Sequence, residues 1–580
     1  MNLSRLMQLI LLGSLLAIIN HAECQECSAN DAEFYLGLIP NLEAQSSVLL
    51  LTNEPEVVNY TIDAPVTGYH FEGSFNGSVF LNLPVNLTGI SRSYPNAYQN
   101  DYKEGIYIKT SSEKVTLIGQ MNSDNNIFNT GTFLSLFKVD LSLEEYVYYA
   151  VSIMGDFLSA DTSVVLVGTG DETMFTLTVP VNASIKINNT ANWTSLTEGI
   201  VYSYQINRLD IVYITASEAG TDMTGTKVVA NKAMSVFSGH ECGSIPTVVA
   251  FCDFLVEQML PTELWGEVYY FAPLIGQDRY TIKIIAAEND TDCQLYCSTT
   301  QRNYSLDAGD YSIATLTNLD FCVIHSTKKI LVVQFSNYYL EDYEGGPMMT
   351  LVPPASHYTN IITSSTIQLF FDLYDHHINI IVFPEYHQPE AIFLTAGGMN
   401  SSLVSYNWIP IVRNNITEAY ATQINVTQGL IQLRHSNNRA LMNAIVYGFD
   451  FVRGYGHPGW LKSCTDVCQS NIHTCEFEFY PFGYSQNDNT LRVEDDTVSD
   501  EIDLSGYFVF NDEWISRIYV GDNGVISFNA AFNGFFLMSF HLQCTNLLHH
   551  TGLMLISEEQ DKCSIVKPLI LVSLPEQAVK

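Results

Sequence analysis

Two dipeptides that contain histidine, His240-Glu241 and His376-His377, have residue types that could support chemistry. His240-Glu241 could contribute to a zinc site, because imidazole and carboxylate groups both bind zinc. The pair lacks the second histidine that a zinc-hydrolase motif requires, so an exposed turn is the better interpretation. His376-His377 begins a strand of alternating pattern, and one of these two side chains should therefore face outward.

Two further groups have the composition of a metal site. The cluster Cys464-x3-Cys468-x6-Cys475 could supply three zinc ligands, but disulfides are the stronger expectation in a secreted chain. The acids between Glu494 and Asp503 could bind calcium through their oxygens. They lack the regular spacing of a dedicated calcium loop, and a solvated acidic loop is the simpler interpretation. We expect no metal site and no cofactor.

No compact catalytic motif is present in the sequence. It contains no Gly-x-Ser-x-Gly elbow, no His-Glu-x-x-His pair and no phosphate-binding glycine loop. We therefore predict no catalytic residues and no enzyme activity. A secreted hydrolase with acids scattered along the sequence is the alternative. It would need those acids to gather in one deep pocket with shifted pKa values.

All 12 cysteines follow Ala22, and their even number suits pairing in an oxidising compartment. Cys242 and Cys252 flank a short loop and should bridge, which would add about 2–3 kcal/mol of stability. Cys293, Cys297 and Cys322 share one repeat, so two of them should pair while the third finds a partner elsewhere. The disulfide candidates are Cys242, Cys252, Cys293, Cys297, Cys322, Cys464, Cys468 and Cys475.

The N-terminus predicts secretion. Arg5 is the only charge before the apolar run 6–19, and Asn20-His21-Ala22 resembles a cleavage site, so residues 1–22 are expected to be a signal peptide. An uncleaved anchor is the alternative, but the run is shorter than the ~20 residues of a spanning helix. No later window is apolar enough to span a membrane. Eleven Asn-x-Ser/Thr sequons follow, at Asn59, Asn76, Asn86, Asn182, Asn188, Asn192, Asn289, Asn303, Asn400, Asn415 and Asn425.

The composition excludes several classes of protein. Lys and Arg number 25 against 62 Asp and Glu, a net charge of −37 that repels phosphate backbones, so we expect no nucleic-acid partner. Hydrophobic residues make up 47% of the chain and charged residues 15%, which is too apolar for a disordered protein.

An internal pattern recurs four times, with copies about 95–120 residues apart. Each copy is a β-rich arm, a short polar turn with a basic residue in or beside it, and a second β-rich arm, which predicts a hairpin. The copies are 105–119, 225–239, 321–335 and 430–448. Helical periodicity is nearly absent, although 252–259 could form a turn or two of helix. We predict an all-β protein of about four β-sandwich-like modules, with a β-propeller-like arrangement as the alternative.

The breakers in 454–459, the cysteine cluster and the loss of sequons together predict a domain boundary near residue 464. The expected organisation is a signal peptide at 1–22, β modules at 23–120, 121–241, 242–340 and 341–459, a cysteine-rich linker with a partial β-rich module at 460–530, and a tail at 531–580 that matches no module.

Several sequence blocks, in their order and spacing, resemble a known family. They are Val236–Cys242, Cys252–Pro261, Leu264–Gly266, Met348–Pro354, His377–Asn379, Val446–Phe449 and Tyr455–Gly459. Together they resemble the N-terminal domain of the IgG Fc-binding protein family over roughly residues 32–459. The resemblance implies a secreted, mucus-type protein. It does not imply Fc binding, because no set of residues for that activity can be placed here.

A second resemblance begins after the boundary. Phe479–Gly483, Asp495-Asp496, Ile502–Leu504 and Ile518–Phe528 are similar to the start of the nidogen-type extracellular (NIDO) domain over residues 479–530. Within the last block, Asn523-Gly524 predicts a tight hairpin turn. The resemblance implies a matrix protein.

These observations predict a secreted glycoprotein that binds other extracellular glycoproteins, as a matrix, mucus or cell-matrix adhesion component. Its binding surface is expected mainly in residues 30–459. Besides the secreted hydrolase, the alternative is a lectin-like binding protein of innate immunity, which would group exposed aromatic side chains at one end of a module.

Overall fold

The computed structural model describes most of the first 461 residues and five short segments beyond them. These residues are 31–38, 44–84, 92–93, 97–98, 105–123, 130–138, 141, 143–153, 162–181, 183–188, 193–218, 220–243, 245, 252–337, 345–367, 374–450, 453–461, 502–510, 513–520, 526–528, 554–555 and 569–570. The chain forms two compact units, Cys27–Thr465 and the combination of Met1–Glu26 with Asp466–Lys580. The expected signal peptide, the cluster Cys464, Cys468 and Cys475, and the acids 494–501 lie outside the described residues.

The described residues form strands almost throughout, which confirms the all-β prediction. Helical turns in the described part are limited to five short 3₁₀ turns: η1 (Thr262–Leu264), η2 (Ala355–His357), η3 (Pro384–Tyr386), η4 (Pro389–Ala391) and η5 (Leu403–Ser405). The expected helical turn at 252–259 is wrong, because β20 (Asp253–Gln258) is a strand buried on both faces. Such a strand has an unbroken apolar pattern that periodicity alone does not distinguish from a helix. No helix in these ranges is both long and apolar enough to cross a membrane.

The first group of strands, which we call lobe 1, packs two antiparallel sheets face to face. Its strands are β1 (Ala32–Leu36), β2 (Ala44–Thr52), β3 (Val58–Ala64), β4 (Tyr69–Phe75), β5 (Ser78–Asn82), β6 (Arg92–Ser93), β7 (Ala97–Tyr98), β8 (Ile106–Thr110), β9 (Val115–Ser123) and β10 (Thr130–Ser135). The sheets have the orders β1-β8-β3-β4 and β10-β9-β2-β5, and β6 pairs with β7. Alternate side chains of β3 are buried, as expected for a strand with one face on a core.

Lobe 2 repeats this topology and adds two strands. Its strands are β11 (Tyr146–Tyr149), β12 (Thr162–Gly168), β13 (Thr173–Thr178), β14 (Ile185–Asn188), β15 (Trp193–Leu196), β16 (Val201–Ile206), β17 (Ile211–Ala216), β18 (Lys227–Ala230), β19 (Met234–Gly243) and β20. The smaller sheet has the order β11-β18-β13-β16, and the larger has the order β15-β14-β17-β12-β19-β20. The added strands β14 and β15 extend the outer edge of the larger sheet.

Lobe 3 has the same topology within one continuous sheet. Its strands are β21 (Gly266–Phe271), β22 (Arg279–Ala286), β23 (Thr291–Cys297), β24 (Gln301–Leu306), β25 (Tyr311–Thr317), β26 (Cys322–Ser336) and β27 (Met349–Leu351). The first part of β26 pairs with β21 and β23, and its second part pairs with β22 and β27. The single strand β26 therefore makes the pairings that β18 and β19 make separately in lobe 2.

Lobe 4 completes the repeat. Its strands are β28 (Ile361–Ser365), β29 (Asp375–Val382), β30 (Ile392–Ala396), β31 (Met399–Ser402), β32 (Ile409–Arg413), β33 (Ile416–Val426), β34 (Leu430–His435), β35 (Met442–Phe449) and β36 (Gly454–Pro458). The sheets have the orders β28-β34-β30-β31 and β32-β33-β29-β35-β36. The larger unit is thus built from four lobes of one topology.

The repeated sequence pattern is real, but its interpretation as a hairpin is wrong. The two arms of the first copy are β8 and β9, and those of the second and fourth copies are β18 with β19 and β34 with β35. In each case the two arms belong to different sheets of their lobe. Both arms are apolar, so each forms an interior strand of its own sheet and the turn carries the chain across the core. The third copy is the single strand β26.

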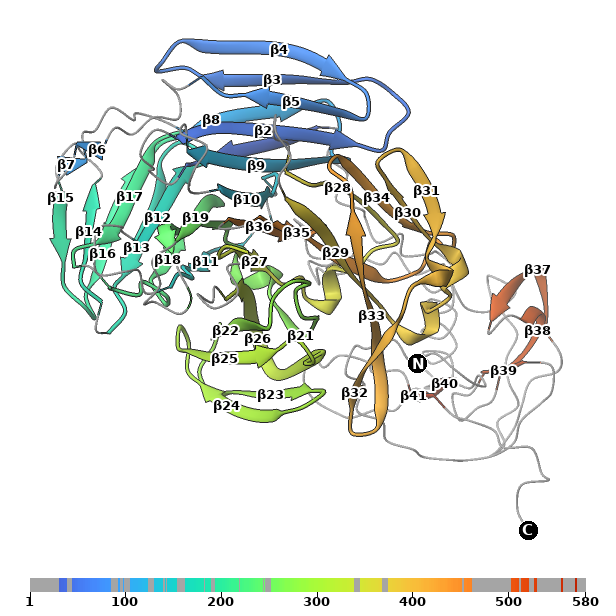
Figure 1. Cartoon of the computed structure of the whole chain (residues 1–580). Coiled ribbons are helices and arrows are strands. Elements are labelled where there is room, and N and C mark those ends of the chain that lie inside the picture. Colours follow the sequence, from blue (N-terminus) through green and yellow to red (C-terminus); the bar gives the residue numbers. More distant parts are fainter. Residues whose placement is uncertain are drawn as a thin grey trace, which may run out of the picture. The chain divides into compact units, whose positions relative to one another are not determined.

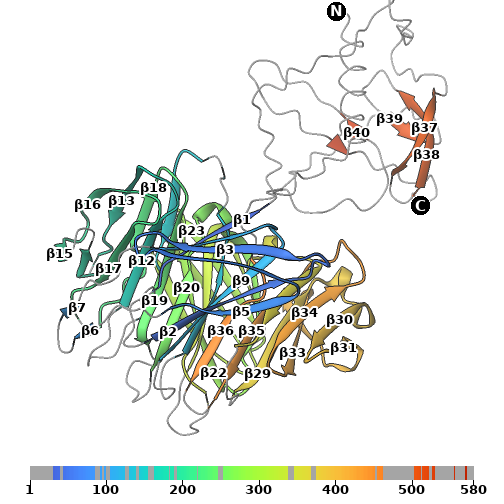
Figure 2. The same ribbon diagram turned by 90° about the horizontal axis from the view of Figure 1, so that it is seen from above.

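The last strand of each lobe lies at the centre of the larger unit. β10 contacts β20, β20 contacts β27, β27 contacts β36, and β36 contacts β10, which closes a ring. Figure 1 labels β10, β27 and β36 at this centre. Seen from above, lobes 2 and 4 lie on opposite sides of lobe 1 (Figure 2). Lobes 1, 2 and 4 each contain two main sheets, as expected of sandwich-like modules, and lobe 3 forms one continuous sheet. The placement of the lobes about a common centre resembles the propeller alternative.

Strand pairing crosses two of the expected module boundaries. β9 runs beyond residue 120 and pairs with β10, and β19 pairs with β20 across residues 241 and 242. Each lobe therefore ends with the strand that it contributes to the centre. The domain boundaries themselves stay a prediction.

The second compact unit contains a five-stranded antiparallel sheet of order β37-β38-β39-β40-β41. Its strands are β37 (Ile502–Phe510), β38 (Glu513–Val520), β39 (Ile526–Phe528), β40 (Met554–Leu555) and β41 (Leu569–Ile570). β38 and β39 pair with each other, while the expected turn Asn523-Gly524 lies outside the described residues.

Candidate functional site

Four outer strands occupy equivalent positions in the lobes and are the candidate binding edges of the protein. β4, β16, β24 and β31 each lie at the far end of a path of four strands that begins at β1, β11, β21 or β28. An edge strand has unpaired N–H and C=O groups along one side, so it can accept a strand from another chain. The differences between these four strands therefore indicate where such a chain could bind.

Three of the four edges carry a glycosylation sequon. Asn303 lies in the middle of β24, Asn400 lies in β31, and Asn76 directly follows β4. All three side chains are exposed. An N-linked glycan is bulky, so a glycan at any of these positions would obstruct strand addition. β16 contains no sequon.

The other sequons are also accessible where the structure describes them. The exposed sequon asparagines are Asn59, Asn76, Asn289, Asn303, Asn400, Asn415 and Asn425. Asn86, Asn182 and Asn192 lie outside the described residues, and Asn188 ends β14 with a side chain that is not described. Glycosylation itself stays a prediction.

The outer face of β13 and β16 is uncharged. Its cross-strand pairs are Met174 with Gln205, Thr176 with Ser203 and Thr178 with Val201. Val201 is 59% exposed and Met174 is 45% exposed. On the opposite face, the ring of Tyr204 stacks on that of Phe175 with a centroid distance of 5.4 Å. The edge is therefore anchored to the core on one side and presents apolar groups to solvent on the other.

The equivalent face of β23 and β24 has different chemistry. Its cross-strand pairs are Asp292 with Ser305, Gln294 with Asn303 and Tyr296 with Gln301. An exposed acid, Asp292, thus takes the place of Met174, and the sequon residue Asn303 takes the place of Ser203. The turns that follow the two edges also match, because Leu209 and Gly309 both have positive φ, 68° and 85°.

Lobes 1 and 2 are joined by an arginine between two tyrosines. The Arg208 guanidinium lies 4.2 Å from the ring centroid of Tyr107, and its Nε donates to the Tyr35 hydroxyl at 3.1 Å. Both tyrosine hydroxyls donate to Glu33, at 2.7 Å from Tyr107 and 3.1 Å from Tyr35. Burial and the neighbouring Glu33 raise the pKa of Tyr107. This cation–π cluster links the two lobes, with both tyrosine rings buried and Arg208 exposed on its outer side.

Lobes 2 and 3 are joined by a buried ion pair. Lys283 Nζ lies 2.7 Å from Asp222 Oδ2, and the two side chains are 2% and 13% exposed. Lys283 also donates to the carbonyl oxygen of Ser152 at 2.6 Å, and the Tyr311 hydroxyl donates to Asp222 at 3.1 Å. Burial lowers the pKa of Lys283; burial acts to raise that of Asp222, but Lys283 and the hydrogen bonds from Thr224 hold it below its usual value.

Lobes 3 and 4 are joined by a charged cluster around Glu418 on β33. His325 Nε2 lies 2.7 Å from Glu418 Oε2, and Arg413 Nε donates to Oε1 at 2.6 Å. Burial acts to raise the pKa of Glu418, but hydrogen bonds from His325 and Arg413 lower it overall. The long hairpin of β32 and β33 is thereby fixed against lobe 3.

Polar side chains also connect the central strands. The N–H of Gly454 donates to Asp253 at 2.7 Å, and that of Leu351 donates to Glu257 at 3.1 Å. His457 Nδ1 lies 3.0 Å from the Thr132 hydroxyl, which links lobes 4 and 1. Burial raises the pKa of Glu257 well above its usual value and lowers that of His457 to about 3. Burial therefore disfavours the charged form of both groups, and His457 is uncharged near neutral pH.

The histidines of both dipeptides are structural. His240 and Glu241 are buried in β19 rather than exposed in a turn, and burial lowers the pKa of His240 to about 4. The expectation that one of His376 and His377 faces outward is also wrong, because they are only 3% and 5% exposed. His376 contacts the Tyr455 hydroxyl, and the ring centroid of His377 lies 5.3 Å from that of Tyr447, so both faces of β29 are covered.

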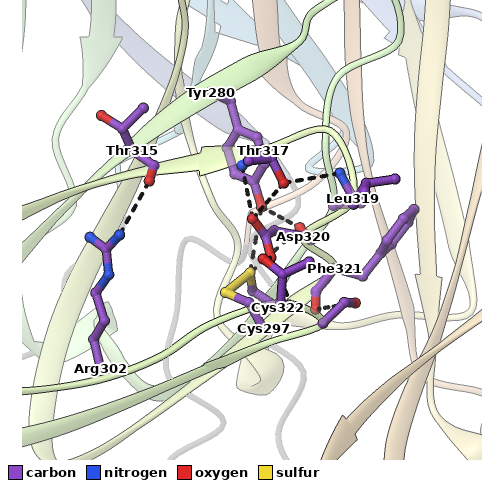
Figure 3. Close-up of a disulfide and its surroundings, with 12 residues drawn as sticks. Tyr280, Cys297, Arg302, Thr315, Thr317, Leu319, Asp320, Phe321 and Cys322 are labelled. Carbon is purple, nitrogen blue, oxygen red and sulfur yellow. Dashed lines mark hydrogen bonds between the residues drawn. A yellow bond between two sulfur atoms is a disulfide. The ribbon is translucent and has the colours of Figure 1, made fainter.

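Two disulfides lie within the described residues. Cys242 in β19 bonds to Cys252, the residue before β20. Cys297 bonds to Cys322, which joins β23 to β26 (Figure 3), while the buried Cys293 is a free thiol and burial raises its pKa to about 12. Beside the second disulfide, Asp320 accepts hydrogen bonds from the N–H groups of Thr299 and Thr317 at 3.0 and 2.8 Å, which fixes the loop.

The contacts between lobes were not predicted from the sequence. Lys283 lies within the apolar strand 280–286, and a charge in such a strand signals a buried partner, but nothing in the sequence identifies Asp222. No group of three His, Cys, Asp or Glu side chains in the described segments could hold a metal ion. One hollow, between lobes 1 and 2, is lined mainly by apolar side chains and includes neither Lys283 nor Asp222.

The comparisons with known proteins agree with the resemblance seen in the sequence. A family model described as IgGFc binding protein matches residues 136–448, more than half of the chain. The human IgGFc-binding protein is 29% identical over 130 residues, which are 22% of this chain and 2% of that protein. The matched segment thus spans a very small part of the relative's length.

Proposed function

This chain belongs to the IgGFc binding protein family, and on that premise we propose that it is a secreted glycoprotein that binds other extracellular proteins. The finer proposal is a matrix, mucus or cell-matrix adhesion component. The observation that carries it is the family match, which covers lobes 2 and 3 and most of lobe 4. The disulfides and the exposed sequons support an extracellular setting.

The architecture supports binding through outer surfaces. Three sequence blocks that carry the family resemblance contain or overlap β20, β27 and β36, which meet at the centre of the ring. These blocks therefore build the scaffold, and the outer strands are left to determine what is bound. Four similar lobes on one chain can also combine weak contacts through effective concentration.

The buried groups with shifted pKa values do not support the hydrolase alternative. Lys283 and Asp222 are paired with each other and surrounded by partners from two lobes. Glu257 is fully buried between β20 and β27. Their pKa values are shifted because they are buried and paired where lobes pack together. This structural role explains the shifts without a catalytic role.

The test is binding of the mature chain to purified mucus glycoproteins and to purified matrix glycoproteins, each measured by surface plasmon resonance. Immunoglobulin Fc serves as a further analyte, because the relative's name refers to it. We expect saturable binding to a glycoprotein fraction, with most of it retained after deletion of residues 464–580. The absence of binding to every fraction would refute the proposal. Loss of binding on deletion, in a fragment that stays folded, would refute the placement in the four lobes.

A further inference from the structure

The four-fold repeat provides an internal comparison of edge strands. β4, β16, β24 and β31 are equivalent, and natural proteins protect such exposed edges with charges, prolines, short strands or bulky groups. β24 contains Arg302 and the sequon residue Asn303, and β31 is short and contains Asn400. β4 contains His70 and Glu72, and a sequon follows it.

β16 has none of these protections. Its sequence is Val-Tyr-Ser-Tyr-Gln-Ile, with six residues and no charge, proline or sequon. The neighbouring strand β13 is also uncharged, and Met174 and Val201 are exposed on the same outer face. In a chain with 62 acidic residues, an uncharged edge beside exposed apolar side chains is suited to contact another polypeptide.

We propose that β16 is a docking edge to which an extended segment of a partner polypeptide adds as a fifth strand beside β11-β18-β13-β16. The main chain of the segment pairs with Val201–Ile206, and its side chains at alternate positions lie beside Val201, Ser203 and Gln205 on the outer face, with Met174 in the next strand inward. This inference rests on the proposed binding function and names the surface that performs it. Main-chain hydrogen bonds provide affinity in such complexes, while alternate side chains provide specificity.

The partner segment belongs to a different protein rather than to a second copy of this chain. Two copies would each carry a net charge of −37, and such charges repel each other on approach. The outer face of β13 and β16 is uncharged, so the segment needs no charges where it pairs with β16. Basic residues at its ends would be attracted by the acidic chain.

The sequon in β24 of lobe 3 provides the design of a variant that tests the β16 edge of lobe 2. Ser203→Asn with Gln205→Thr converts Ser-Tyr-Gln into the sequon Asn-Tyr-Thr, which is the arrangement of Asn303-Tyr304-Ser305 in the equivalent strand. Ser203 and Gln205 are both exposed, so the change disturbs no buried contact. Ser203→Asn alone makes nearly the same substitution without a sequon. Asn303→Ser removes the glycan from β24 and is the control for glycan loss.

The experiment uses the mature chain from animal cells, with glycan occupancy at 203 and 303 determined by mass spectrometry. The probe is the peptide Lys-Thr-Val-Thr-Val-Thr-Val-Thr-Lys, and a version with two central prolines is the control peptide. Binding is measured by fluorescence anisotropy, and protection of amides 201–206 by hydrogen exchange. We expect binding of the probe with protection of 201–206, and at least tenfold weaker binding to the chain glycosylated at 203. Ser203→Asn alone and Asn303→Ser should bind like the unmodified chain.

Three results would overturn the inference. They are failure of the probe to bind at millimolar concentration, equal binding after glycosylation at 203, and protection that appears only outside 201–206. Concentration-dependent dimers that protect 201–206 without the probe would show that a second copy is the occupant instead. If the chain binds mucus or matrix glycoproteins equally well with a glycan at 203, the docking edge is wrong while the proposed function stands. If it binds none of them, the proposed function itself fails.

Discussion

Lobes 2 and 3 have the same strand topology but different exteriors and different cores. The edge strands β16 and β24 hold equivalent positions, yet one is uncharged and the other carries Arg302 and Asn303. Inside the lobes, Phe175 and Cys293 occupy equivalent buried positions, each 1% exposed. The comparison shows that the pairing pattern tolerates large changes of side chain on both faces. Binding properties can therefore differ between lobes that share one scaffold.

The joint between these lobes should give the largest effect on stability. Lys283→Ala leaves the Asp222 carboxylate buried without its cation, which should cost about 3–5 kcal/mol in the free energy of unfolding. Urea unfolding followed by intrinsic fluorescence measures this loss as a lower midpoint. Lys109→Ala, which removes a partner of the exposed pair with Asp31, is the control and should change the midpoint little. An unchanged midpoint for Lys283→Ala would show that the pair does not join the lobes.

The two cores should respond unequally to the same substitution. Phe175→Ala removes a large buried ring that stacks on Tyr204, and should cost roughly 3–5 kcal/mol. Cys293→Ala removes only a thiol at the equivalent position, and should cost about 1 kcal/mol. Urea unfolding of the two variants under identical conditions gives the difference. Equal losses would contradict the expectation that the larger buried side chain of Phe175 contributes more to stability than that of Cys293.

Acid should weaken the folded state through the buried histidines. The pKa of His240 is lowered to about 4 and that of His457 to about 3, while an unfolded histidine titrates near 6.5. Below pH 6.5 the unfolded chain therefore binds protons that the folded chain does not, and the free energy of unfolding falls. Each histidine should account for roughly 3 kcal/mol by pH 4. The pKa of Glu257 is raised in the folded chain, so the folded state binds a proton at this carboxyl group before the unfolded state does. As the pH falls towards 4.5, Glu257 therefore increases the free energy of unfolding and partly offsets the effect of the histidines.

Urea midpoints at intervals between pH 4 and pH 7 measure this dependence, and His457→Gln should reduce its slope. A slope that the substitution leaves unchanged would mean that His457 is not held neutral at the centre of the ring.

The smallest effect is expected at the open edge. Met174→Asp gives β13 the acid that β23 has at Asp292, and both positions are exposed, so stability should change by less than about 0.5 kcal/mol. Binding of extended partner segments should weaken all the same. Thermal unfolding and probe binding, measured on one preparation, separate the two effects. A large loss of stability would show that Met174 packs against the fold rather than presenting a free surface.

The fold class and the repeat were predicted from composition and from the spacing of residues close together in the sequence. Alternating apolar strands and Gly and Asn turns are local signals, and the short loop between Cys242 and Cys252 is another. Arms such as β18 and β19 were mistaken for a hairpin, because sequence shows that two strands are apolar but not that they lie in different sheets. The burial of both His376 and His377 depends on neighbours from distant segments, which periodicity does not reveal.

The candidate site was predicted only in part. The sequons were visible as triplets, but their concentration on equivalent edges depends on the pairing of strands far apart in the chain. The joints of Arg208, Lys283 and Glu418 bring together residues from different lobes. Such contacts arise from tertiary packing, and no local pattern encodes them.

The most direct test of the account is hydrogen exchange on the mature glycosylated chain, with and without a saturating purified glycoprotein to which it binds. The amides of 201–206 and 301–306 are compared in the same sample, so each edge serves as the control for the other. The account predicts slower exchange at 201–206 on binding and unchanged exchange at 301–306. Protection confined to 301–306, or equal protection of both edges, would contradict it.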